Sequence, residues 1–179
     1  RWWKLRTKQM SKLFDCLRID HFRGFEAYWA VKYGEPTAIN GEWIKGPDKA
    51  IVDAFKQAAP KLQIIAEDLG DITKEVIELV EESGFPGMRV FQFGFLGGET
   101  PHKPHNYKNN SIAYSGTHDN PTIVSWFFEI SESEREDVRN YLCDKYTPDS
   151  EINFPIIGAV MRSVAKLVII PIQDYLGYD

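Results

Sequence analysis

Short apolar runs that end in polar or charged residues recur along the chain. They extend from Leu17 to Asp20, Ile64 to Glu67, Val90 to Phe95 and Ile112 to Asp119. A further run, Leu167 to Ile172, is continuous and β-branched, which is typical of a strand buried on both faces. The pattern predicts parallel strands that deliver polar groups at their carboxyl ends.

Between these runs the apolar residues recur at helical spacing. A helix is expected over 51–59, and another follows Thr73, which suits an N-cap. Further helices are expected over 131–146, where acidic residues follow Ser131, and over 156–164. Strands and crossover helices therefore alternate.

Glycine and proline mark loops without forming a linker. Such loops are expected at 41–47, 83–87 and 97–104. We therefore expect a single domain over residues 1–179 with no internal boundary. The alternation fits a doubly wound sheet or a (β/α)₈ barrel, and both place ligands at the carboxyl ends of their strands. The pattern alone leaves both architectures open.

Composition narrows the class of protein. The chain has 179 residues, 43% of them hydrophobic, enough for the core of a globular domain. Its net charge of −5 arises from interspersed charges, so neither nucleic acid nor an anionic membrane is expected as a partner. Cys16 and Cys143 form no C-x-x-C pair, which disfavours a disulfide framework. Without an apolar membrane span or a signal-peptide core, a cytoplasmic enzyme is expected.

The first charged strand end contains Arg18, Asp20 and His21. Strand alternation puts Arg18 and Asp20 on the same side. A neighbouring guanidinium favours the ionised carboxylate, which is the form that a carboxylate nucleophile requires. An ordinary ion pair at the end of a strand is the alternative, and this segment alone leaves both open.

The second charged strand end contains two consecutive acids, Glu67 and Asp68, which point to opposite faces. Apolar neighbours and a nearby carboxylate are expected to favour the protonated form of Glu67, which is the form that a general acid requires. Asp68 and Asp71 are expected instead to cap the helix that begins near Ile72.

The third strand end, Tyr114 to Pro121, breaks into a polar turn that contains His118 and Asp119. A Ser-His-Asp triad with Ser115 is disfavoured because the chain has no G-x-S-x-G nucleophile elbow.

Metal and nucleotide chemistry are also disfavoured. His102 and His105 lie in a proline-rich loop instead of at the H-E-x-x-H spacing of a helical metal site. The chain has neither a G-x-G-x-x-G nor a Walker-type phosphate loop. We therefore expect no metal and no cofactor.

Three motifs resemble the catalytic motifs of amylomaltases, the disproportionating 4-α-glucanotransferases of the α-amylase superfamily. They are Arg18 to Gly24, Ala66 to Gly70 and Ser115 to Asn120; Pro104 to Tyr107 and Ile170 to Gly177 resemble further stretches. The resemblance implies an α/β fold of the (β/α)₈ TIM-barrel type, of which this chain is an incomplete portion from about strand 4 to strand 8. It also implies that the remainder of the barrel lies on the same longer chain.

The same resemblance implies roles for individual residues. Asp20 is implied as the nucleophile, Glu67 as the acid/base and Asp119 as the carboxylate that stabilises the distorted donor sugar. Substrate contacts are implied for Arg18, His21, Gln92, Phe93, His118 and Asn120. A retaining mechanism requires nucleophile and acid/base carboxyls about 5–5.5 Å apart.

The implied reaction transfers α-1,4-glucan segments between maltooligosaccharide or starch-type donors and acceptors. A hydrolase of the same superfamily is one alternative, because the catalytic motifs do not separate water from a sugar acceptor. A non-catalytic glucan-binding fragment is another. Residues 1–179 in isolation are expected to be inactive.

Overall fold

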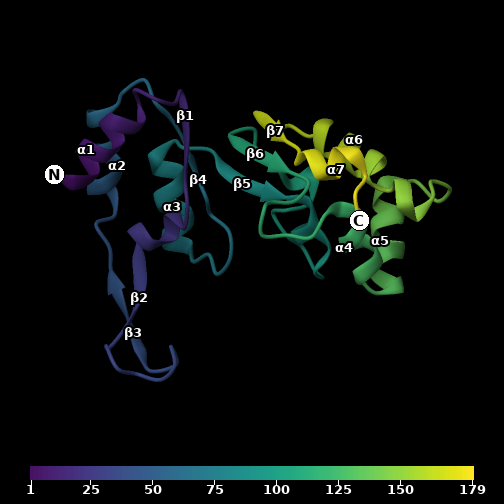
Figure 1. Ribbon diagram of the computed structural model, residues 1–179, viewed down its shortest axis with the longest axis horizontal. Helices are drawn as coiled ribbons and strands as arrows, with labels where there is room; N and C mark the ends of the chain where they lie inside the picture. Colours follow the sequence, from purple (N-terminus) through teal and green to yellow (C-terminus); the bar gives the residue numbers. More distant parts are fainter. The chain divides into compact units, whose positions relative to one another are not determined.

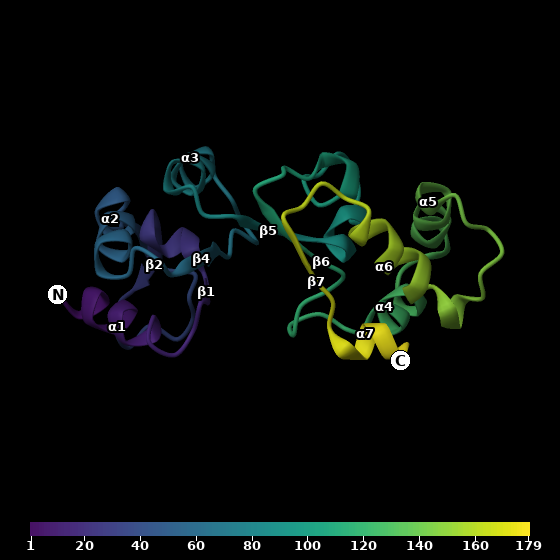
Figure 2. The ribbon, with the colours of Figure 1, turned by 90° about the horizontal axis from the view of Figure 1, so that it is seen from above.

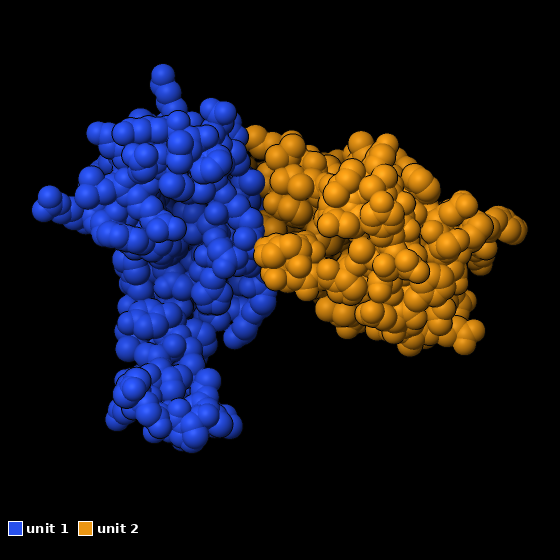
Figure 3. Space-filling model, viewed as in Figure 1, with its two compact units in different colours: residues 1–87 blue, residues 88–179 orange.

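A computed structural model describes residues 1–179, and the chain divides into two compact units (Figure 3). Unit 1 comprises Arg1–Gly87 and unit 2 comprises Met88–Asp179. Each unit has a hydrophobic core of its own. The expectation of a single domain without an internal boundary stays a prediction.

Unit 1 contains parallel strands, helices and a separate hairpin (Figure 1). In chain order its elements are α1 (Trp2–Met10), β1 (Cys16–Ile19), the 3₁₀ helix η1 (Phe22–Phe25), β2 (Ala27–Val31), β3 (Gly41–Lys45), α2 (Lys49–Ala58), β4 (Gln63–Ala66) and α3 (Lys74–Ser83). Strands β1 and β4 pair in parallel, from Cys16↔Gln63 to Ile19↔Ala66. The predicted strands that precede Asp20 and Glu67 are therefore confirmed.

The core of unit 1 forms where α2 and α3 cover β4. Phe55 of α2 and Leu79 of α3 are almost fully buried and pack in one cluster with Phe22 and Ile64. Burying a side chain of this size contributes about 1.5–3 kcal/mol, so this cluster holds the strand ends of unit 1 in place. The helices expected over 51–59 and after Thr73 are confirmed.

The hairpin of β2 and β3 was not expected from the sequence. The two strands pair antiparallel, and Trp29 packs edge-on against Trp43 with ring centroids 5.5 Å apart. The prediction of a loop at 41–47 is therefore wrong over Gly41–Lys45. The apolar run Ala27–Val31 was not interpreted as a strand, and the glycine and proline residues at 41–47 are typical of a loop.

Unit 2 pairs two parallel strands and surrounds them with short helices (Figure 2). Its elements are β5 (Gly87–Val90, which begins at the last residue of unit 1), η2 (Phe91–Phe95), η3 (Pro104–Asn106), β6 (Ser111–Tyr114), α4 (Ile123–Glu129), α5 (Glu132–Leu142), η4 (Asp149–Glu151), α6 (Asn153–Met161), β7 (Leu167–Ile169) and α7 (Ile172–Leu176). Strands β6 and β7 pair from Ile112↔Leu167 to Tyr114↔Ile169.

Two helices of unit 2, α4 and α5, begin at side-chain caps, and the helices α4, α5 and α6 share one core. Ser131 and Glu134 form a complete capping box at the start of α5, which confirms the helix expected there. Phe127, Val138 and Ile156, from α4, α5 and α6, are fully buried in one cluster. Across the whole chain, no helix combines the length and apolar character that crossing a membrane requires.

Two strand predictions need correction. The run from Val90 to Phe95 is not a strand: β5 ends at Val90, and Phe91–Phe95 form a 3₁₀ helix. Both conformations bury a short apolar run, so the run alone does not distinguish them. Strand β7 exists, but Leu167 and Ile169 are 46% and 38% exposed, so it is not buried on both faces. Only its other face, with Val168, packs against the core.

Candidate active site

Two carboxylates follow the last paired residues of β1 and β4. Ile19 pairs with Ala66, and the next residues are Asp20 and Glu67. The Glu67 backbone N–H donates to the Ile19 carbonyl at 3.0 Å, and the Phe22 N–H donates to the Glu67 carbonyl at 3.0 Å. Because neighbouring strands lie about 4.8 Å apart, the two acidic residues occupy adjacent positions at one edge of unit 1.

Asp20 forms an ion pair and remains open to solvent. Its Oδ1 lies 2.9 Å from Arg18 Nη2, and its side chain is 75% exposed. The pairing expected from strand alternation is thus confirmed. An exposed ion pair contributes only about 0–1 kcal/mol to stability, so its main physical effect is to orient the carboxylate.

Glu67, in contrast, is buried and held by backbone donors. Its Oε2 accepts from the His21 N–H at 2.6 Å, and its Oε1 accepts from the Leu69 N–H at 2.8 Å. His21 has a left-handed backbone (φ 47°), which costs a non-glycine residue about 1–2 kcal/mol. The hydrogen bond to Glu67 helps to offset this strain. Each carboxylate oxygen has a second lone-pair site, where a catalytic proton or a ligand can bind.

The expected helix caps at Asp68 and Asp71 are wrong. Helix α3 begins at Lys74, with Thr73 in the N-cap position. Asp68 is 8% exposed, and its carboxylate lies against Gly87. Asp71 lies instead beside Arg23, whose Nη1 is 3.6 Å from its carboxylate and donates to its carbonyl at 2.8 Å. Both aspartates precede the helix by too much sequence to reach its first N–H groups.

In unit 2 the segment after β6 presents His118 and Asp119 to solvent. His118 Nε2 lies 3.5 Å from Asp119 Oδ2, and the two side chains are 73% and 77% exposed. The turn is closed by Asn120, whose Oδ1 accepts from Thr117 N at 2.9 Å and from Thr117 Oγ1 at 2.7 Å. Asn120, expected to contact substrate, therefore uses its side-chain oxygen to hold the turn.

Buried polar side chains form hydrogen bonds that hold the backbone at the ends of this turn. Gln92 is 2% exposed, and its Nε2 donates to the Pro121 carbonyl at 2.9 Å. Gln92 was expected to contact substrate, but this hydrogen bond directs its amide nitrogen into the protein. Ser115 is fully buried and donates to Asp174, which explains why it is unsuited to act as a nucleophile. Phe93 is half-buried, with its ring against His102.

The histidines of the proline-rich loop have structural partners. His102 Nδ1 accepts from the Val90 N–H at 3.1 Å, and burial, assisted by the charge of Arg89, lowers the pKa of His102 to about 4. His105 Nδ1 lies 3.0 Å from the Tyr141 hydroxyl. Nowhere in the chain do three His, Cys, Asp or Glu side chains gather as metal ligands would.

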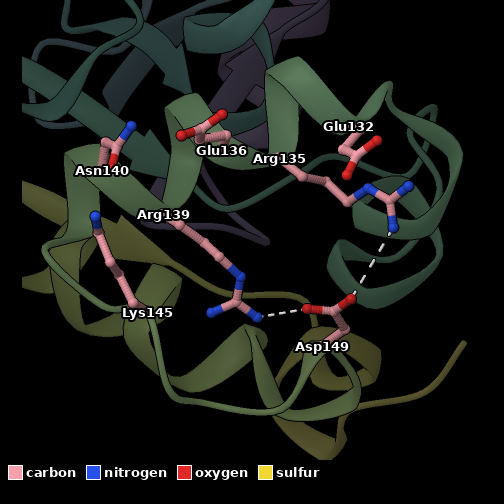
Figure 4. A pocket seen from close by; sticks show the side chains of 7 residues that line it. All are labelled: Glu132, Arg135, Glu136, Arg139, Asn140, Lys145 and Asp149. Carbon is pink, nitrogen blue, oxygen red and sulfur yellow. Dashed lines mark hydrogen bonds and ion pairs between the residues drawn. The ribbon is translucent and has the colours of Figure 1, made fainter.

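Unit 2 also has a hollow of about 400 Å³, lined by residues of α5 and of the segment that follows it (Figure 4). Arg139 lines this hollow and donates to the carbonyls of Asp144 and Thr147 and to the carboxylate of Asp149. Asp149 also lies 4.0 Å from Arg135. These arginines are therefore engaged in fixing the loop after α5, and we place the candidate active site at the strand ends instead.

The structure thus brings the predicted site residues together in two groups. In unit 1 they are Arg18, Asp20, His21 and Glu67; in unit 2 they are Gln92, His118, Asp119 and Asn120, whereas Phe93 contacts His102. Sequence reasoning missed Asp174 as a member of the second group. The signal available was the pair Gln173-Asp174 directly after an apolar run.

Comparison with known proteins gives consistent matches. A family model described as 4-alpha-glucanotransferase matches residues 1–179. The 4-alpha-glucanotransferase of Clostridium butyricum is 48% identical over 177 residues, which cover 98% of this chain and 36% of that protein. The one from Aquifex aeolicus is 46% identical over 177 residues, covering 99% and 36% respectively. The chain therefore spans about a third of the length of these relatives.

Solved structures agree with these sequence matches. The amylomaltase from Streptococcus agalactiae in complex with acarbose matches with a TM-score of 0.91 at 36% identity, covering 99% of this chain and 36% of that one. An amylomaltase from Corynebacterium glutamicum matches with a TM-score of 0.74 at 15% identity, covering 96% and 30%, and shows the shared fold alone.

Proposed function

Because the chain belongs to the 4-α-glucanotransferase family, we propose that it supplies the catalytic carboxylates for retaining transfer of α-1,4-glucan segments between maltooligosaccharides. Its fold is α/β, a portion of a (β/α) barrel. The observation that carries the proposal is the register of β1 and β4, which puts Asp20 and Glu67 at adjacent strand ends. Retaining enzymes need two carboxyl groups about 5–5.5 Å apart, and strands about 4.8 Å apart are compatible with this spacing.

In the first step Asp20 acts as the nucleophile. A carboxylate oxygen attacks the anomeric carbon of the donor, an ester bond forms and the glycosidic carbon–oxygen bond breaks. Glu67 gives its proton to the departing oxygen, which leaves as the 4-hydroxyl of the released glucan. The Arg18–Asp20 ion pair supports this role, since it orients the exposed carboxylate.

In the second step an acceptor 4-hydroxyl replaces the released glucan. Glu67, now ionised, takes the proton from this hydroxyl. The acceptor oxygen attacks the anomeric carbon, and the ester bond to Asp20 breaks. Two inversions at the same carbon retain the configuration. The backbone donors on Glu67 support this exchange because they hold the carboxylate in one orientation through both steps.

Asp119 and His118 bind the hydroxyls of the donor sugar. Both side chains are exposed on a turn whose backbone is held from within, as a residue that must meet a ligand requires. The amylomaltase from Streptococcus agalactiae was solved in complex with acarbose, which supports a saccharide as the ligand of this site. A cytoplasmic location stays a prediction.

The test uses the full-length protein that carries this sequence, incubated with maltotriose. We expect glucose together with oligosaccharides longer than maltotriose, because the maltosyl group passes to a second maltotriose. The same protein with Glu67→Gln is the control and should form these products at least about a hundredfold more slowly. Glucose and maltose without longer products would show a hydrolase, and binding without any product would show a glucan-binding protein.

A further inference from the structure

We propose that Asp174 is a positioning residue, which holds both ends of the turn that presents His118 and Asp119 to the substrate. The inference rests on the proposed function, since it assigns a purpose to the placement of Asp119. Asp174 lies in α7, 55 positions beyond Asp119 in the sequence, and is 2% exposed. It does not itself touch the solvent-exposed face where a sugar would bind.

The carboxylate of Asp174 bridges the entry and the exit of the turn. Its Oδ2 accepts from the Ser115 hydroxyl at 2.6 Å, directly after β6. Its Oδ1 accepts from the Ile123 N–H at 2.9 Å, at the first residue of α4. One rigid planar group therefore fixes the two points between which residues 116–122 must fold.

The buried carboxylate of Asp174 is bound by one O–H donor and one N–H donor. Burying a carboxylate is costly, and the O–H and N–H donors offset this cost only if they stay in place. The backbone of Asp174 is fixed in turn, because Asn153, which is 1% exposed, donates from Nδ2 to the Asp174 carbonyl at 2.9 Å.

Gln92 adds contacts to both arms of the turn, at Gly116 and at Pro121. Its amide donates to the Pro121 carbonyl, and the backbone of Gly116 approaches it so closely that a Cβ at Gly116 would lie 2.8 Å from Gln92 Nε2. The segment is therefore held at Ser115, Pro121 and Ile123 by buried side chains. His118 and Asp119, in contrast, extend into solvent with side chains that are 73% and 77% exposed.

Placement of this kind matters because a misplacement of about 1 Å at a catalytic group can cost about a hundredfold in rate. Ser115→Ala removes one of the two hydrogen bonds to Asp174. Ser111→Ala is a matched control, because Ser111 lies at the other end of β6, is 1% exposed and donates to the Lys108 carbonyl at 2.6 Å. We expect Ser115→Ala to lower kcat/KM for maltotriose by about tenfold and Ser111→Ala by less than about twofold, at a similar loss of Tm.

A double-mutant cycle separates positioning from a general structural role. In the full-length protein, assayed with an α-maltosyl fluoride donor, Asp174→Asn should lower kcat/KM by about a hundredfold when Asp119 is present. In the Asp119→Asn background the same change should lower it by less than about threefold, because the group being positioned is already lost.

The possible outcomes are distinct. If the unmodified protein forms no products longer than maltotriose from maltotriose, the proposed function is wrong, whatever the role of Asp174. If it does make them but Ser115→Ala behaves like Ser111→Ala, or the losses from Asp119→Asn and Asp174→Asn simply multiply, the positioning role is wrong. Should Asp174→Asn not fold, the comparison of Ser115→Ala with Ser111→Ala decides the question.

Discussion

The strand end of unit 1 and the turn of unit 2 hold their carboxylates in opposite ways. Glu67 is 8% exposed, and backbone N–H groups bind its carboxylate oxygens directly. Asp119 is 77% exposed, and the supports around it bind the backbone of the turn instead. A carboxylate can therefore be fixed through its own oxygens or through the chain that carries it.

The difference fits the tasks that we propose. Glu67 must take and give a proton at one fixed point, so contacts on the carboxylate itself serve it well. Asp119 must leave its oxygens open for sugar hydroxyls, and contacts on those oxygens would compete with the ligand. Its supports are therefore placed one layer deeper, at Gln92, Ser115 and Asp174.

The largest effect is expected for Asp20→Asn in the full-length protein. The amide is a far weaker nucleophile than the carboxylate, so transfer should fall by several powers of ten while maltooligosaccharide binding remains measurable. Transfer rates and calorimetric binding test this together. A variant that keeps more than about a tenth of the transfer rate would leave Arg18–Asp20 as an ordinary ion pair.

A smaller effect is expected on the free energy of unfolding at acidic pH, and it should arise from His102 in unit 2. Burial lowers the pKa of His102 to about 4, so the unfolded chain binds a proton at higher pH than the folded chain does. This contribution to stability is present above about pH 6.5 and is lost as the pH falls from there to about 4. The loss is at most about 3.5 kcal/mol, since the pKa falls from 6.5 to about 4 and one pKa unit corresponds to about 1.4 kcal/mol.

The control for this prediction is His102→Gln, whose side-chain oxygen can accept from the Val90 N–H without titrating. Chemical denaturation of both proteins at several pH values isolates the histidine, because the carboxylates common to both cancel in the difference. Equal pH dependence of the two proteins would contradict the assignment.

The smallest effects distinguish the two modes of support directly. Glu67→Gln leaves only one side-chain acceptor for two backbone donors, so the free energy of unfolding should fall by about 1–3 kcal/mol. Asp119→Asn should change it by less than about 0.5 kcal/mol, because that side chain is exposed. Denaturation curves of the two variants measure this, and equal losses would show that the carboxylates are not held differently.

The strand ends could be predicted because their signal is local. The apolar runs before Asp20 and Glu67 give the strand, and the charges that follow give its end. The start of α5 was equally readable, since the capping box of Ser131 and Glu134 spans only one turn. Such features depend on residues that are close in sequence, so they can be predicted without knowledge of the rest of the fold.

The deeper supports could not be predicted because their partners are remote. Ser115 and Asp174 are separated by 59 residues, and nothing near either one shows that the other lies beside it. The prediction of a strand over Phe91–Phe95 was wrong for a related reason. Packing against the core of unit 2 overrides the local preference of these residues for a strand. The hairpin of β2 and β3 was missed because the glycine and proline residues around β3 are typical of a loop.

The central claim, that Asp20 is the nucleophile and Glu67 the acid/base, is tested most directly by trapping the covalent intermediate. In full-length Glu67→Gln protein, an α-maltosyl fluoride donor needs little protonation of its leaving group, so the first step proceeds while the second is slow. After proteolysis at low pH, we expect the mass of one maltosyl group on the peptide that contains Asp20. The same added mass on the peptide that contains Asp119 would contradict the account.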